Sequence, residues 1–133
     1  MRKTQTTVLT SLVVGVVSLL AVLVPAGPAQ ADTNHFRETS RQVAREIGCK
    51  RWYSTGGGGT TYKSGVCWLR GKRVNVLTFR NRTQQRSWNE FAPLLGPQHY
   101  WANGTGAIVS AKNGNRPAAV LGARMLPGKV RHG

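Results

Sequence analysis

Acidic side chains are scarce in this chain of 133 residues, which has four aspartates and glutamates against nineteen lysines and arginines. A mature chain that began at Asp32 would keep seventeen basic and all four acidic residues, a net charge of +13. Solubility of a small domain needs a net charge of only roughly 2 to 8. The excess predicts attraction to polyanions such as nucleic acid, anionic wall polymers or a lipid surface. The alternative is a charge that serves solubility alone.

Cysteine is also rare, with only Cys49 and Cys67. Two thiols with His35, His99 and His132 do not reproduce the spacing of a zinc site, so the sequence predicts no metal site, and no motif predicts a cofactor. In an exported chain, two cysteines favour a disulfide. The bridge would close a loop of about 19 residues and stabilise the fold by roughly 3 kcal/mol.

One long apolar run occurs, from Val8 to Val24, between a basic start and the small-residue site Ala29-Gln30-Ala31. This order is typical of a secretory signal peptide, here residues 1–31, rather than of a membrane span. The residue after the expected cut is Asp32 and not a cysteine, so no lipid anchor is indicated. We therefore expect a secreted, extracellular protein with no stable membrane anchor.

The remaining residues predict a single small α+β domain over 32–126 and a mobile tail over 127–133. The expected order is helix, β-hairpin, helix, strand and short helix. It gives a two-layer domain, with a three-stranded antiparallel sheet covered by helices on one face and one disulfide. The first helix is expected after the capping residues Asp32 to Asn34 and before Gly48. The glycine-rich stretch from Ser54 to Thr61 is expected to be a loop.

The hairpin is expected to join strands Val66–Leu69 and Val74–Phe79 through a type II′ turn at Gly71-Lys72. A third strand is expected at Ala107–Ala111, paired beside the first, and a short helix from Pro117 to Ala123. The helix between hairpin and third strand is expected to begin after a capping pair and to bury an apolar stripe. The pair is Asn81 and Gln84, and the stripe is Trp88, Phe91, Ala92 and Leu95.

The tip of the hairpin is one candidate binding surface. The expected register places Arg70 opposite Arg73, with Trp68 next along the same face and Lys72 at the turn. Facing arginines repel unless an anion lies between them, and an aromatic ring beside arginines is typical of single-stranded nucleic-acid binding. The alternative is that residues 50–61 cover Trp68 and that the arginines point into water.

The first expected helix carries a second basic feature. Arg37, Arg41 and Arg45 recur every four residues, and Lys50 and Arg51 follow. An anionic partner would relieve the repulsion along this stripe, although such stripes are usually solvated. The candidate binding residues are therefore Arg37, Arg41, Arg45, Lys50, Arg51, Trp68, Arg70, Lys72 and Arg73.

Evidence for an enzyme is thin in the sequence. A small secreted nuclease could use Glu90 and His99 as base and acid, but Arg86 offers Glu90 an ordinary ion pair four residues away. No Gly-x-Ser-x-Gly motif occurs. No Gly-Lys-Ser/Thr follows Gly56–Gly59, so a phosphate-binding loop is not supported.

Several short motifs extend over most of the mature chain. They are Gly65-Val66-Cys67-Trp68-Leu69, Val74-Asn75-Val76 with Phe79, Gln85 with Trp88, and Gly104-Thr105-Gly106-Ala107. This pattern resembles short secreted actinomycete proteins without an assigned activity. The resemblance implies secretion and one domain, and it carries over no catalytic residue.

The sequence thus predicts a secreted, non-enzymatic protein that associates with anionic polymers, nucleic acid or wall polymer, through arginine-rich surfaces. One alternative is a small secreted nuclease or hydrolase that uses His99 and Glu90. Another is a secreted inhibitor or protein-interaction domain, whose affinity would persist at high salt because apolar contacts are not screened.

Overall fold

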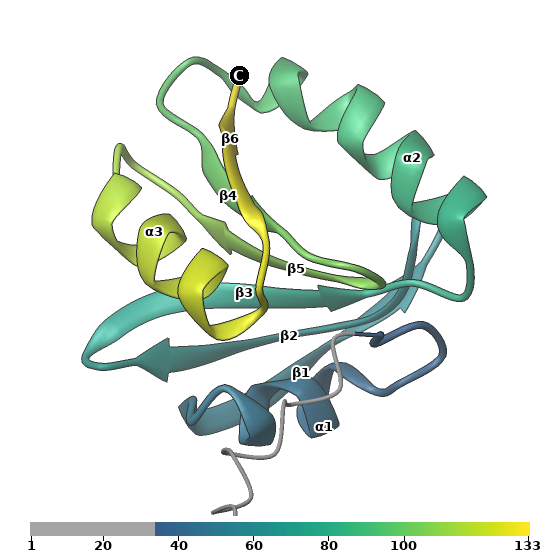
Figure 1. Cartoon of the computed structure of the whole chain (residues 1–133), viewed down its shortest axis with the longest axis horizontal. Coiled ribbons are helices and arrows are strands. Elements are labelled where there is room, and N and C mark those ends of the chain that lie inside the picture. The colour runs from purple at the N-terminus through teal and green to yellow at the C-terminus, as the bar shows by residue number, and fades with distance from the viewer. Residues whose placement is uncertain (1–33) are drawn as a thin grey trace, which may run out of the picture.

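Six strands form one antiparallel sheet in the computed structural model, which describes residues 34–133 (Figure 1). The signal peptide expected at 1–31 lies outside the described residues. The order across the sheet is β1-β2-β3-β5-β4-β6. The strands are β1 Lys50–Gly58, β2 Thr61–Leu69, β3 Lys72–Thr78, β4 Tyr100–Asn103, β5 Ala107–Ala111 and β6 Lys129–His132.

Helices cover both faces of this sheet. They are α1 Ser40–Glu46, α2 Arg82–Phe91 with the 3-10 turn η1 Ala92–Leu95 directly after it, and α3 Arg116–Met125. Side chains of a strand alternate between faces, so Val76 of β3 joins a core with α1 and α3, and Leu77 joins a second core with α2. Figure 1 shows α2 and α3 on opposite sides of β4 and β6.

The expected three-stranded, two-layer domain with helices on one face is therefore wrong, although the α+β class with one disulfide is confirmed. Strands β1 and β6 occupy residues expected to be loop and tail. The third expected strand, β5, pairs with β3 rather than with β2. Because β5 is buried along its whole length, it needs cover on both faces, and three layers result.

The glycine-rich stretch forms the outer end of β1 rather than a loop. Gly56 lies opposite Ser64 and Gly58 lies opposite Thr61, with irregular register between these pairs. Glycine is tolerated here because β1 is an edge strand and because its bulges need positive φ angles, 100° at Gly56 and 127° at Gly58.

The expected tail at 127–133 contributes β6 to the opposite edge. Tyr100 pairs with His132 and Asn103 pairs with Lys129, and Figure 1 shows β6 beside β4. Val130 packs against the core that contains α3. Its neighbours Lys129 and Arg131 are exposed, which suits an edge strand.

The β2–β3 turn differs from the expected one by two residues of register. Leu69 pairs with Lys72, so the turn residues are Arg70 and Gly71, with φ angles of 46° and 78° as in a type I′ turn. Arg70 is therefore not opposite Arg73, which lies opposite Trp68 instead. A shift of two keeps every side chain on its expected face, so the predicted core residues of both strands are buried: Cys67, Leu69, Val74 and Val76.

The helices also depart from expectation at particular residues. α1 begins after Thr39, which forms a capping box with Gln42, so the expected caps at 32–34 are wrong. Asn81 caps α2 as predicted, and Asn115 caps α3. The expected stripe on α2 is half right, because Trp88 and Ala92 are buried and Phe91 and Leu95 are exposed. The helix passes into η1 at Ala92, and the tighter turn rotates Leu95 away from the core.

The predicted disulfide between Cys49 and Cys67 is present. It joins the residue before β1 to a residue near the end of β2, with a Cα–Cα distance of 5.7 Å. A disulfide indicates an oxidising environment. Among residues 34–133, the helices are too short and polar to cross a membrane.

Removing the bridge should destabilise the domain. For the Cys49→Ser/Cys67→Ser variant, we expect the free energy of unfolding to fall by about 3 kcal/mol, because the unfolded chain regains the entropy of an 18-residue separation. Urea unfolding followed by circular dichroism measures this. Reductant should lower the stability of the native protein by a similar amount and leave the variant unchanged. Equal stability of the two proteins in the absence of reductant would contradict the prediction.

Candidate functional site

Basic side chains dominate the described surface without acidic partners. Residues 34–133 contain seventeen lysines and arginines and three glutamates. Both ion pairs between these residues join His35 to a glutamate, and within this range no lysine or arginine pairs with a carboxylate. The ion pair expected between Arg86 and Glu90 is not among them. The positive charge is thus left available to an external anion.

Two aromatic rings and an arginine lie together near the β2–β3 turn. The ring centroids of Tyr53 and Trp68 are 6.1 Å apart, with the planes tilted by 49°. Arg73, opposite Trp68, donates a hydrogen bond from Nη2 to the Tyr53 hydroxyl at 2.9 Å. Tyr53 is 42% exposed and Trp68 is partly exposed. Residues 50–58 form a strand beside Trp68 and not a loop, and this strand leaves Trp68 partly exposed.

One hollow lies at Trp68 and another at Arg73. One, of about 560 Å³, is lined by Trp68 together with Lys50, Arg51 and Arg70. The other, of about 450 Å³, is lined by Arg73 and by polar residues of β3 and β5 and the chain after β5, among them Asn75, Ser110 and Lys112. No acidic side chain lines either hollow. We call the ring pair and the basic residues beside it the cationic aromatic surface, defined as Lys50, Arg51, Tyr53, Trp68, Arg70 and Arg73.

The structure brings together five of the nine predicted binding residues, all of which belong to the cationic aromatic surface. Lys72 pairs with Leu69, whose side chain points to the core with α1. Paired residues share a face, so Lys72 extends on the α1 face of the sheet and not on the face that carries Trp68. Arg41 and Arg45 lie on α1, which covers that same face. Arg37 precedes α1 with a φ of 68°, and its amide donates to the Phe79 carbonyl, so the expected helical stripe is interrupted.

Tyr53 is the residue of this surface that sequence reasoning missed. It reaches Trp68 through the β1–β2 pairing, in which Tyr53 lies opposite Val66. Residues 50–53 show no alternation of polar and apolar side chains that would have marked a strand. The glycines that follow also hid the strand, because they carry no side chains and read as loop.

His99 is buried and does not contact Glu90. Its Nε2 lies 2.8 Å from Ser110 Oγ, within hydrogen-bond distance, whereas Glu90 is exposed on α2. Burial lowers the pKa of His99, and the nearby positive charge of Lys112 lowers it further. The described residues therefore place a neutral imidazole against a hydroxyl, and no hydrogen bond or ion pair joins His99 to Glu90 among them.

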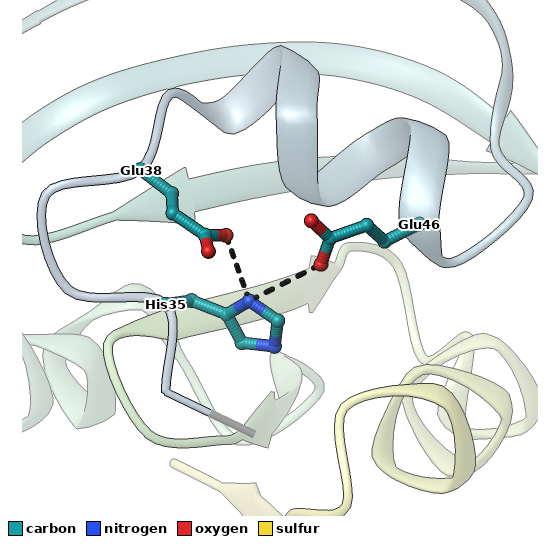
Figure 2. Close-up of side chains that lie close together, drawn as sticks. All are labelled: His35, Glu38 and Glu46. Atoms are coloured by element: carbon teal, nitrogen blue, oxygen red, sulfur yellow. Dashed lines mark hydrogen bonds and ion pairs between the residues drawn. The ribbon is translucent and has the colours of Figure 1, made fainter. Parts of the chain in front are cut away.

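A second histidine holds two of the three described glutamates (Figure 2). His35, with 3% exposure, donates from Nδ1 to Glu38 Oε2 at 2.9 Å and approaches Glu46 Oε2 at 3.4 Å. These three residues are the group in the described part of the chain whose donor atoms, all within 4.8 Å of one another, could hold a metal ion. The spacing of cysteines and histidines did not indicate this group, because two of its three members are glutamates.

The hydrogen bonds around His35 suggest a structural clamp. Figure 2 shows the carboxylates of Glu38, from the chain before α1, and Glu46, from the last residue of α1, converging on the same nitrogen. The His35 amide also donates to the Thr105 carbonyl at 2.9 Å. The residue thereby ties the chain before α1 to both the helix and the β4–β5 loop.

Comparison with protein-family models, curated proteins and solved structures gave no match. The resemblance to short secreted actinomycete proteins stays a prediction.

Because His99 is buried, the stability of the folded protein should decrease as the pH drops. The folded pKa of His99 lies below the usual value of about 6.5, so the unfolded chain takes up a proton first as the pH drops. The full contribution is present above about pH 6.5 and is lost between that pH and the folded pKa. We expect the melting temperature of the native protein to decrease over this window more than that of a His99→Gln variant. Parallel melting curves would contradict the assignment.

Proposed function

We propose that the protein is a secreted, non-enzymatic binder of anionic polymers, and of single-stranded nucleic acid in particular, through the cationic aromatic surface. The observation that carries this proposal is the Tyr53–Trp68 ring pair on the sheet, bordered by Lys50, Arg51, Arg70 and Arg73 with no acidic side chain among the lining residues.

The chemistry of the surface favours nucleic acid over other polyanions. Charge alone attracts any polyanion, but aromatic rings add affinity only for a ligand that can stack. Each stacked base contributes about 1–3 kcal/mol. Arg73 is held in place by its bond to Tyr53, so a cation is fixed beside the stacking surface before ligand arrives. An anionic wall polymer without rings would contact the basic side chains but would gain no stacking energy from Trp68.

Secretion belongs to the same proposal. The disulfide suits an oxidising compartment, and the described residues contain no helix that could span a membrane. Both agree with cleavage of a signal peptide near Ala31 and release of the mature chain, as the sequence predicts.

Replacing Trp68 separates stacking from charge. For Trp68→Ala, we expect the affinity for a single-stranded RNA to fall roughly 5- to 150-fold per base lost from the ring, with an unchanged salt slope. Fluorescence anisotropy of a labelled oligonucleotide over a series of salt concentrations measures both quantities. Affinity for polyphosphate, which has no bases, should be unaffected. An equal loss for RNA and polyphosphate would show that the ring serves only the fold.

Arginine pairs on the two faces of the sheet test where the polymer lies. In Arg70→Gln/Arg73→Gln, we expect the slope of log affinity against log salt to become shallower by about 1.4, since each contact to a single strand contributes about 0.7. The matched variant Arg41→Gln/Arg45→Gln removes the same charge from α1 and should keep the native slope. Similar slopes for the two variants would rule out a defined surface and leave only diffuse attraction.

A further inference from the structure

An open cavity of about 470 Å³ lies between α2, the β4–β5 loop and β6. Three arginines line it, Arg82 and Arg86 from α2 and Arg131 from β6, together with the side chains of Gln85, Asn89 and Asn103. It is remote from the cationic aromatic surface along the sheet. Arg73 lies at the start of β3, whereas the β4–β5 loop is hydrogen-bonded to Phe79, the residue just after the end of β3.

The amide side chains of the cavity form a closed network. Gln85 Nε2 donates to Asn103 Oδ1 at 3.0 Å and to the Gly104 carbonyl at 2.7 Å, and Gln85 Oε1 accepts from the Gly106 amide at 2.9 Å. Asn89 Nδ2 donates to Asn103 Oδ1 at 2.9 Å, and Asn89 Oδ1 accepts from Trp101 Nε1 at 3.0 Å. Every side-chain oxygen of the three amides is thus engaged within the protein.

One donor of this network is left over. Asn103 Oδ1 accepts two hydrogen bonds, which fixes the amide plane, whereas Asn103 Nδ2 has no partner among the described residues. No buried polar side-chain atom of residues 34–133 lacks a partner, so this nitrogen must face solvent. The network therefore leaves none of the three amide oxygens unbonded and exposes one amide donor, Nδ2 of Asn103, a residue that lines the cavity.

The charged residues that line the cavity are all cationic. Arg82 and Arg86 are four residues apart and share one side of α2. The side chains of these two residues and of Arg131 make no hydrogen bond or ion pair with another described residue, and no carboxylate lines the cavity. Three guanidinium groups around one space repel one another, and an anion between them would reverse the sign of the interaction.

We propose that this cavity is a binding site for a tetrahedral phosphate group. Guanidinium groups bind phosphate oxygens through paired, charge-assisted hydrogen bonds, and Asn103 Nδ2 adds a neutral donor. Because the amide oxygens are already engaged, the site offers donors to an oxyanion and offers little to a cation. The proposal goes beyond the polymer-binding function and does not depend on it, since the two sites share no residue. The phosphate can be inorganic phosphate or a phosphate of a nucleic acid.

Calorimetric titration of the disulfide-bonded protein with inorganic phosphate in chloride buffer tests the site. We expect one phosphate per chain, and at least tenfold weaker binding in Arg82→Gln/Arg131→Gln. Both side chains are exposed, so this variant should fold, and its melting temperature without phosphate verifies that. The matched variant Arg41→Gln/Arg45→Gln loses the same charge and should bind as the native protein does. No phosphate binding by the native protein, or equal weakening in the two variants, would overturn the proposal.

Two further arms identify the source of the phosphate and separate the sites. If a single-stranded oligonucleotide competes with inorganic phosphate in both the native protein and Trp68→Ala, the cavity binds nucleic-acid phosphate. If the oligonucleotide does not compete, the cavity binds free phosphate. Trp68→Ala should keep its affinity for inorganic phosphate. Loss of RNA binding with intact phosphate binding would overturn only the polymer proposal. Loss of phosphate binding with intact RNA binding would overturn only the phosphate site.

Discussion

Burial of β5 on both of its faces is the constraint on which the rest of the architecture depends. All five residues from Ala107 to Ala111 are buried, so apolar cover must come from both sides of the sheet. α1 and α3 supply it on one face and α2 on the other. With both faces of the central strands occupied, basic side chains are excluded from the middle of the molecule and gather at its ends and edges. The positions of both candidate binding sites follow from this exclusion.

The parts of the fold that could be predicted are those in which residues close together in the sequence determine the structure. The core faces of β2 and β3 were correct although their register was not, because a shift of two residues preserves the face of Val74 and of Cys67. Asn81 marked the start of α2 because its side chain satisfies a free amide wherever the helix packs. The disulfide was predictable because only two cysteines exist.

The parts that failed depend on contacts distant in sequence. Glycines gave β1 no alternation to detect, and β6 is four residues long with three basic side chains. Arg37 has the spacing of a helical residue, but the chain turns there with a positive φ to reach Phe79. For the same reason Tyr53 and the second cavity were hidden. Tyr53 and Trp68 are fifteen positions apart and meet only through strand pairing. The arginine-lined cavity joins Arg82 and Arg86 of α2 to Arg131 of β6, which is 49 and 45 positions away.

The disulfide has a consequence for when the protein can act. Cys49 immediately precedes Lys50, and Cys67 immediately precedes Trp68, so the covalent bond lies beside the paired residues at the edge of the cationic aromatic surface. Before oxidation, no covalent bond holds the start of β1 against β2. If the protein binds nucleic acid as proposed, a reduced chain would hold Lys50 beside Trp68 less firmly than the oxidised chain does. The oxidation state of one cysteine pair would then set the order of the binding surface.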